Sequence, residues 1–268
     1  MTMNLHDARL QAELLLSHTL ETTRSALLAR LNEAIGADVA AHFAANVARR
    51  AQHEPLAYII GHREFYGLEF LVDRRVLIPR HETELVVQLA LERARRIADP
   101  LIADVGTGSG AIALSLARHL TDARILASDI SREALAVAQI NASRLHLDRV
   151  QLLQGDLLTH LDQPFDLLIA NLPYIPSVRY RQLPREIRDF EPRVALDGGF
   201  DGLAIMRRII TQLKPLVRRG SIALFEISEE QGRSAMELLQ RELPFASCQT
   251  HRDLEGLDRV IEVEFKAN

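Results

Sequence analysis

The strongest constraint on the fold is a regular alternation of short apolar runs with helical segments after residue 100. Five runs have the length and composition of buried strands: LIADVG, RILASD, VQLLQGD, FDLLIAN and SIALFEI. Helical segments lie between and after them, beginning near Gly110, Ser131, Gly202 and Glu229. Strands that are apolar along their whole length and alternate with helices are typical of a parallel sheet covered on both faces. We therefore predict an α/β fold for this part of the chain.

The last two strand-like runs are connected differently. FASCQTHRD and RVIEVEF are joined by LEGLD, which is too short for a helical crossover, so the two runs should pair antiparallel. The prediction is a seven-stranded, mostly parallel sheet that ends in an antiparallel hairpin. This is the usual layout of methyltransferases that use S-adenosylmethionine.

The first sixty residues carry helical periodicity instead. RLQAELLLSHTL and DVAAHFAANVARRAQ place apolar side chains at steps of three and four residues. EFYGLEFLVD then alternates around Gly67 like a short hairpin, and LIPRHETE leads into a helix over about residues 83–97. We predict a small all-α domain over residues 1–62, a β-hairpin linker over 63–80 and an α/β domain over 81–268.

Composition bounds the possible partners. The 268-residue chain has a formal net charge of −4, so it lacks the overall basic field that drives nonspecific nucleic-acid binding. Its single cysteine, Cys248, rules out an internal disulfide and fits a reducing compartment. We find no basic-then-apolar leader and no apolar stretch long enough to span a bilayer. We expect a cytoplasmic monomer with no membrane association and no stable nucleic-acid binding.

A glycine-rich loop follows the first parallel strand, where the chain turns into a helix. Open α/β sheets bind ligands beyond the carboxyl ends of their strands, and a helix start offers free N–H groups. The loop also satisfies the dinucleotide fingerprint through Gly106, Gly108 and Ala111, so alone it does not separate a nicotinamide cofactor from S-adenosylmethionine. The candidate cofactor-binding residues here are Asp104, Gly106, Thr107, Gly108, Ser109 and Gly110.

Polar residues also stand where the next two strands end. Asp129 closes the second strand, and a carboxylate there can accept hydrogen bonds from both hydroxyls of a ribose, in either cofactor. Because Ser131 is a good N-cap for the next helix, we favour the ribose role for Asp129 over a capping role. Asp156 and Leu157 follow the third strand, where Asp156 can accept from an adenine amine and Leu157 can pack on the ring. A polar turn without a ligand explains Asp156 equally well.

The fourth strand ends abruptly in Asn171-Leu172-Pro173-Tyr174. Pro173 removes a backbone donor and restricts Leu172 to extended angles, so the chain leaves the sheet in a stiff turn. The Asn171 side-chain oxygen and the Leu172 carbonyl can accept the two hydrogens of a planar NH2 group. Holding that weak nucleophile in line with a methyl donor offsets much of the entropic barrier, and the Tyr174 ring favours positive charge growing on the nitrogen. Because dehydrogenases need no such turn, it favours a methyltransferase.

These motifs resemble the HemK-type protein-(glutamine N5) methyltransferases, which methylate the glutamine of the Gly-Gly-Gln motif in peptide chain release factors. The resemblance runs nearly end to end, through REFYGLEF, LIPRHETE, DVGTGSGAIALSLA, NLPYIP, FEPRVALDGGFDGL and RDLEGLDRVIEV. It implies an S-adenosylmethionine-dependent enzyme whose helical domain docks a release factor and whose residues 81–268 form the catalytic domain.

By motif, the resemblance also implies roles for the candidate residues. The Gly106–Gly110 loop and Asp129 would hold the methionine and ribose portions of the cofactor. Asp156 and Leu157 would border its adenine. The turn from Asn171 to Tyr174 would grip the glutamine amide, and Asn171 would also contact the cofactor.

One position departs from the family pattern, which reads Asn-Pro-Pro-Tyr where this chain has Leu172. Leucine supplies the same backbone carbonyl but lacks the restriction that proline would place on Asn171. Asn-Leu-Pro-Tyr also occurs in ribosomal RNA adenine dimethyltransferases, so an adenine-N6 methyltransferase of RNA or DNA is the alternative function. The negative net charge and a helical domain that precedes the sheet argue against it. The intact turn and glycine loop argue against a third interpretation, a binding protein that has lost catalysis.

Other polar residues support weaker hypotheses. The ten histidines show no metal-ligand spacing, and we predict no metal site. Arg80, Glu82 and Glu84 in the linker motif either line the cofactor or order the domain joint. Residues 177–193 hold five arginines against three acids just after the turn, and we favour a lid or a docking surface for a release factor over a solvated helix.

Overall fold

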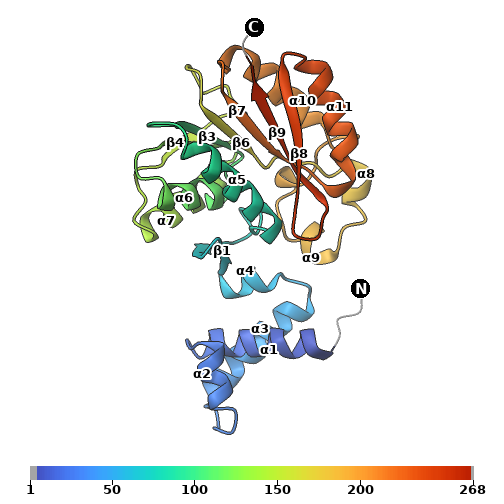
Figure 1. Cartoon of the computed structure of the whole chain (residues 1–268). Helices are drawn as coiled ribbons and strands as arrows, with labels where there is room; N and C mark the ends of the chain where they lie inside the picture. Colours follow the sequence, from blue (N-terminus) through green and yellow to red (C-terminus); the bar gives the residue numbers. More distant parts are fainter. Residues whose placement is uncertain (1–4, 267–268) are drawn as a thin grey trace.

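The computed structural model describes residues 5–266, in which a helical N-terminal part adjoins a larger α/β part (Figure 1). The N-terminal part contains α1 (Leu5–Thr19), α2 (Arg24–Ala29), α3 (Ala37–Ala51) and α4 (Leu56–Ile60). At the end of α3, Arg50 forms an ion pair of 2.9 Å with Glu186 of the α/β part. None of the described helices is long and apolar enough to cross a membrane.

The predicted hairpin is formed by β1 (His62–Phe65) and β2 (Leu68–Leu71). Its two turn residues, Tyr66 and Gly67, both have positive φ angles of 51° and 72°, as the favoured two-residue hairpin turns require. Phe65 and Phe70 are only 1% and 0% exposed, and they pack into the same core as α5, α6 and α7. The hairpin is therefore anchored in the α/β part.

The α/β part contains one seven-stranded sheet in the order β5-β4-β3-β6-β7-β9-β8. The first five strands in this order are parallel, and β9 runs antiparallel to both of its neighbours. This confirms the predicted seven-stranded α/β fold with its terminal hairpin. The strands are β3 (Leu101–Val105), β4 (Arg124–Asp129), β5 (Gln151–Gln154), β6 (Leu167–Ala170), β7 (Ile222–Glu226), β8 (Ala246–Arg252) and β9 (Asp258–Phe265).

Helices cover both faces of the sheet, so each strand sends alternate side chains into two cores. On β3, Ile102 packs with residues of α5, α6 and α7, whereas Ala103 and Val105 pack with residues of α10 and α11. Because both faces of the sheet are buried, the strands are hydrophobic along their whole length. The helices are α5 (Glu84–Ala94), α6 (Ala111–His119), α7 (Arg132–Arg144), α10 (Ala204–Leu213) and α11 (Gly232–Glu242).

The arginine-rich segment after β6 forms short turns. It contains α8 (Ser177–Tyr180), α9 (Arg185–Arg188) and the 3-10 turn η2 (Arg193–Ala195). Proline precedes all three turns, at positions 176, 184 and 192. The fixed φ of proline suits the start of a helix, and a proline cannot continue a helix that precedes it. The other 3-10 turns are η1 (His81–Thr83), η3 (Lys214–Leu216) and η4 (Glu229–Gln231).

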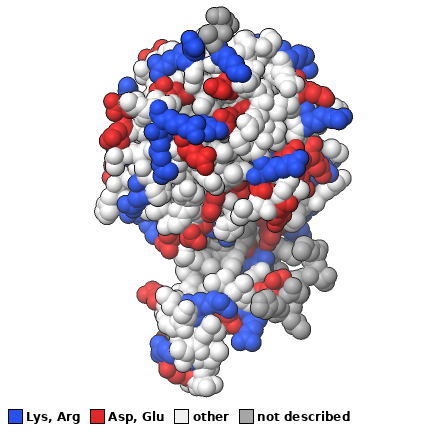
Figure 2. Space-filling view, in the orientation of Figure 1, with Lys and Arg blue, Asp and Glu red and all other residues white. Residues whose placement is uncertain are grey.

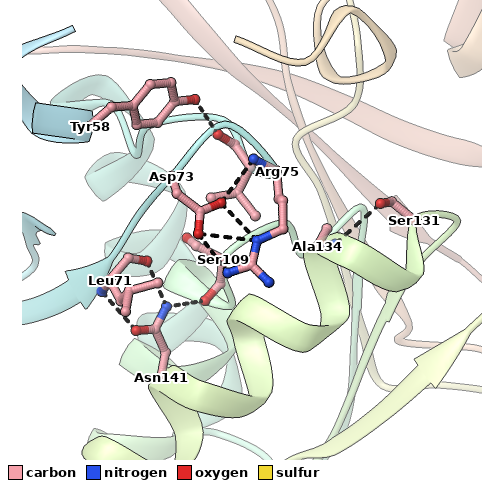
Figure 3. Close-up of polar contacts among 9 residues, drawn as sticks. Tyr58, Leu71, Asp73, Arg75, Ser109, Ser131, Ala134 and Asn141 are labelled. Atoms are coloured by element: carbon pink, nitrogen blue, oxygen red, sulfur yellow. Dashed lines mark hydrogen bonds and ion pairs between the residues drawn. The ribbon is translucent and has the colours of Figure 1, made fainter. Parts of the chain in front are cut away.

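A buried amide also fastens the hairpin to the α/β part. Asn141 of α7 is 0% exposed; its Oδ1 accepts from Leu71 N at 2.7 Å, and its Nδ2 donates to Leu71 O at 3.1 Å. The same Nδ2 donates to Ser109 O at 2.9 Å, in the glycine loop (Figure 3). Asn141 thus joins the end of β2 to the loop that follows β3.

We predict that Asn141→Leu lowers the free energy of unfolding by about 3 kcal/mol, because three backbone groups lose a buried partner. The measurement is urea denaturation followed by circular dichroism. Gln139→Leu, an exposed substitution on the same helix, is the control and should change the stability by less than about 0.5 kcal/mol. Equal stabilities for the two variants would contradict a fastening role for Asn141.

Candidate active site

A cavity opens at the carboxyl edge of β3, β4 and β6. Most of the predicted cofactor-binding residues line it: Gly106, Thr107, Gly108, Ser109, Asp129, Asp156, Leu157 and Asn171. Asp104 and Gly110 lie behind this lining. The cavity therefore brings together predicted residues as far apart in the sequence as Gly106 and Asn171, which are separated by 65 positions.

The glycine loop adopts the conformation that its composition favours. Gly106 and Gly108 have φ angles of 76° and 56°, which side-chain-bearing residues rarely adopt. Gly106 N and Thr107 N both donate to Ser128 O at 2.9 Å, so the loop is fixed to the end of β4. A Cβ added at Gly106 would lie 3.3 Å from Leu172 Cδ2, whereas one added at Gly108 would meet no atom within 4 Å. Glycine at 106 thus permits close contact with the turn after β6.

Asp104 supports this loop from within the core. It is 1% exposed, and its Oδ2 accepts from Thr107 Oγ1 at 2.6 Å and from Ala113 N at 3.2 Å. Its Oδ1 is buried without a hydrogen-bond partner among residues 5–266. Burial raises the pKa of the Asp104 carboxyl to about 7. Asp104 therefore supports the glycine loop from behind the cavity, through Thr107.

Asp129 is held at the rim of the cavity by backbone groups. Its Oδ2 accepts from Gly108 N and its Oδ1 from Ser131 N, both at 2.9 Å. Burial raises the pKa of this carboxyl, and the backbone donors oppose the shift. Ser131 caps α7 by accepting from Ala134 N at 3.2 Å, as predicted (Figure 3). Two backbone bonds fix Asp129 while its carboxylate still lines the cavity.

The third strand end contributes Asp156 and Leu157 to the same cavity. Leu157 has a φ of 57°, a conformation unusual for a residue other than glycine. Asp156 is ion-paired with Arg208 of α10, which also lines the cavity. Arg208 lies 52 positions further along the chain, in a helix whose sequence shows no binding motif, and sequence reasoning missed it.

The Asn-Leu-Pro-Tyr turn is held from several sides. Asn171 Nδ2 donates to Thr83 Oγ1 at 3.2 Å, which leaves Oδ1 as the outward-facing end of the amide. Gln231 Nε2 donates to Tyr174 O at 2.9 Å, and Tyr174 Oη donates to Glu226 Oε1 at 3.4 Å. Sequence reasoning missed Thr83, Gln231 and Glu226, because no local pattern relates them to the turn.

The Leu172 side chain has a packing role, in addition to the role predicted for its backbone carbonyl. Its side chain is 9% exposed and belongs to the apolar core on the α10 side of the sheet. It also touches the position of Gly106, as described above. Leucine therefore seals the contact between the turn and the glycine loop, a contact that a smaller proline ring would fill less completely.

Two glycines of the DGGFDGL motif press against the backbone of the turn. A Cβ at position 198 would lie 2.7 Å from the Pro173 carbonyl oxygen. A Cβ at position 202 would overlap the Tyr174 carbonyl oxygen and reach within 2.5 Å of Gln231 Nε2. The sequence alone showed the motif but not this role, because the contacts join segments 25 or more residues apart.

A second, smaller cavity adjoins the first. Its lining is largely apolar and consists of Leu77, Arg80, Asn171, Tyr174, Ile175, Ile187, Ala195 and Leu196. Leu77, Arg80, Asn171 and Ala195 line both cavities. Ile187, Ala195 and Leu196 belong to the segment around α9 and η2, which thus forms a wall of this cavity. Asn171 stands where the two cavities meet.

The linker motif contributes to the wall and to the domain joint. Arg80 donates to Glu191 Oε1 at 2.5 Å, and Glu191, which is 5% exposed, also accepts from Ile78 N at 3.1 Å. Arg80 therefore both lines the cavities and ties the linker to the segment after α9. Glu84 accepts from Tyr66 N at 3.1 Å, which orders the hairpin turn.

The fold and this paired cavity define a methyltransferase of the Rossmann-like class. The sequence matches the family described as "Methyltransferase domain" over residues 101–253 and the family described as "PrmC N-terminal domain" over residues 3–61. The fold is similar to the crystal structure of a ribosomal protein L11 methylase from Lactobacillus delbrueckii subsp. bulgaricus, with a TM-score of 0.53 at 24% identity, covering 72% of this chain and 82% of that one.

Two full-length relatives define the family more closely. The chain is 46% identical to a release factor glutamine methyltransferase of Moorella thermoacetica, covering 94% of this chain and 89% of that protein. It is 42% identical to a release factor glutamine methyltransferase of Geobacter sulfurreducens, covering 95% and 89%. The chain belongs to the release factor glutamine methyltransferase family.

We predict that Gly202→Ala reduces methyl transfer roughly tenfold to hundredfold, because the added carbon displaces the carbonyl of Tyr174 and moves the turn. Gly220→Ala is the matched control. Gly220 has a similar φ of 84° but no atom within 4 Å of its added carbon, so that variant should lose only about 1 kcal/mol of stability and keep its activity. Steady-state rates and melting curves separate the two effects. Equal activity losses would show that strain, and not contact with the turn, is responsible.

Proposed function

We propose that this chain transfers a methyl group from S-adenosylmethionine to the side-chain amide nitrogen of the glutamine in the Gly-Gly-Gln motif of peptide chain release factors. The observation that carries the proposal is the pair of cavities that meet at Asn171. One has the polar rim that a nucleoside cofactor needs, and the other has the narrow apolar walls that suit an extended side chain. The names of the two relatives support the same acceptor.

The residues of the larger cavity fit the cofactor. When bound, S-adenosylmethionine supplies a methyl group activated by its sulfonium sulfur. The glycine loop suits its methionine portion, and Asp104 holds that loop in place from behind. Asp129 suits the ribose hydroxyls, and Asp156 with Leu157 suits the adenine.

The smaller cavity would take the glutamine side chain. Because Thr83 accepts from Asn171 Nδ2, the Asn171 Oδ1 is oriented to accept from the amide that is methylated. The Leu172 carbonyl takes the second hydrogen, and Pro173 keeps that carbonyl in place. The Tyr174 ring lines this cavity and would favour the positive charge that develops on nitrogen. A nitrogen that carries that charge can release its extra proton to water, so no general base is needed.

The observation that favours the alternative acceptor, an adenine amine in RNA or DNA, is the Asn-Leu-Pro-Tyr sequence. A flipped base requires a wide slot and contacts to phosphates. On the face in Figure 2, Lys and Arg side chains are mixed with acidic side chains over the α/β part. We therefore favour the protein acceptor and propose that the enzyme acts as a monomer in the cytoplasm, where release factors work.

We predict that, when release factor, ribosomal RNA and DNA are offered together with labelled S-adenosylmethionine, the label enters only the release factor. A release factor whose Gly-Gly-Gln glutamine is changed to glutamate should remain unlabelled. Asn171→Ala should lower transfer by about a hundredfold, because the acceptor nitrogen loses its alignment, while calorimetry shows cofactor binding largely preserved. Label in RNA or DNA and none in the release factor would contradict the proposal and favour the alternative.

We predict that Asp129→Ala raises the dissociation constant of S-adenosylmethionine about tenfold to hundredfold, the equivalent of the roughly 1.5–3 kcal/mol of charge-assisted hydrogen bonds to ribose. Titration calorimetry measures the change. Glu133→Gln removes an exposed acid at the start of α7, the helix that follows Asp129, outside the cavity, and should leave the constant unchanged. An unchanged constant in a folded Asp129→Ala variant would place the ribose elsewhere.

A further inference from the structure

One side of the smaller cavity is formed by residues 185–196, the wall segment. Ile187, Ala195 and Leu196 of this segment line the cavity. The helix within it, α9, is a single turn of four residues. Helices this short are not stable in water by themselves, because each turn costs more conformational entropy than its few hydrogen bonds return. The wall segment must therefore be held in place by contacts with other parts of the chain.

The N-terminal part and the linker supply such contacts. Arg50, at the end of α3, forms its ion pair of 2.9 Å with Glu186 of α9. The guanidinium of Arg74, in the linker, lies 4.7 Å from the centre of the Phe190 ring, within the range of a cation–π interaction. Glu191 is held by the linker, as described above. Three side chains of the wall segment are thus fastened from outside the seven-stranded sheet and its helices.

Arg50 is itself fixed in orientation on the N-terminal side of this joint. Its Nε donates to Gln11 Oε1 at 2.7 Å, and its Nη1 donates to Glu54 O at 3.1 Å, which leaves Nη2 for Glu186. The Arg50 side chain is only 19% exposed. Exposed ion pairs usually contribute little, because two long side chains must be ordered to form them. Here the planar guanidinium is already ordered by its other two acceptors, so less freedom is lost in the pair with α9.

We propose that Arg50 is a positioning residue for methyl transfer: its pair with Glu186 holds α9, and with it Ile187, against the smaller cavity. The inference rests on the proposed function, because that cavity is the proposed site of the acceptor glutamine. Glu186 and Ile187 are neighbours in a single helical turn, so a displacement of one carries the other. The N-terminal part therefore contributes to the alignment of the acceptor amide, in addition to the docking role that the sequence predicts.

Positioning and docking have different kinetic signatures. A loss of alignment lowers kcat and kcat/KM together, whereas a loss of docking contacts raises KM and leaves kcat unchanged. Arg50 and Glu186 do not line the cofactor cavity, so neither effect should change the dissociation constant of S-adenosylmethionine.

The test uses the full-length wild type, Arg50→Gln, Glu186→Gln and the double variant. Hydrogen exchange followed by mass spectrometry on the free enzyme should show amides of residues 185–191 exchanging roughly threefold to tenfold faster in each single variant. With a release factor as substrate, kcat should fall roughly threefold to tenfold, while KM changes less than about twofold. The double variant should be no worse than Arg50→Gln, because both substitutions remove the same ion pair.

Arg30→Gln is the matched control. It makes the same change of charge in the same part of the molecule, but Arg30 pairs at 2.6 Å with Glu33, which also belongs to the N-terminal part. It should leave the exchange of the wall segment and kcat unchanged.

Unchanged exchange of the wall segment in Arg50→Gln and Glu186→Gln would overturn the positioning role. A raised KM with an unchanged kcat, or losses that add fully in the double variant, would also overturn it, while wild type still methylates the release factor. No methylation by wild type would overturn the proposed function, and with it this inference. That failure is distinguishable from the others because it affects the unmodified enzyme.

Discussion

The site depends on the parallel pairing of β3 with β6. Val105 pairs with Ala170 at the end of this ladder, so the next residues, Gly106 and Asn171, leave the sheet side by side. A Cβ at Gly106 would lie 3.6 Å from the Asn171 carbonyl oxygen, so the cofactor loop and the acceptor turn are in direct contact. Because both segments emerge from a rigid sheet, their separation is fixed without a ligand, which is the preorganisation that methyl transfer to a weak nucleophile requires.

Local patterns predicted the sheet, the glycine loop, Asp129 and the turn after β6, because each is encoded in a few consecutive residues. The supports of the turn were not predictable in this way. Thr83, Gly202 and Glu226 lie 88, 31 and 55 positions from Asn171 in the sequence, and only the folded chain brings them to one place. Residues 177–196 also carry no clear periodicity, since prolines divide them into single turns.

Two buried carboxylates make the stability of this region depend on pH. Burial raises the pKa of Asp104 from an ordinary value of 3.8, and that of Glu226 from 4.5, in each case to about 7. As the pH rises from about 4, the unfolded chain releases these protons before the folded protein does. The stability of the fold should therefore decline with rising pH until both groups are ionised near pH 7, where the decline ends.

The most direct test is a crystal structure of the enzyme with S-adenosylhomocysteine and a release factor. The account predicts the homocysteine and nucleoside in the cavity bordered by the glycine loop and Asp129. It also predicts the Gly-Gly-Gln glutamine in the smaller cavity, its NH2 group between Asn171 Oδ1 and the Leu172 carbonyl. A glutamine bound outside that cavity, or an Asn171 amide that presents Nδ2 to it, would contradict the account.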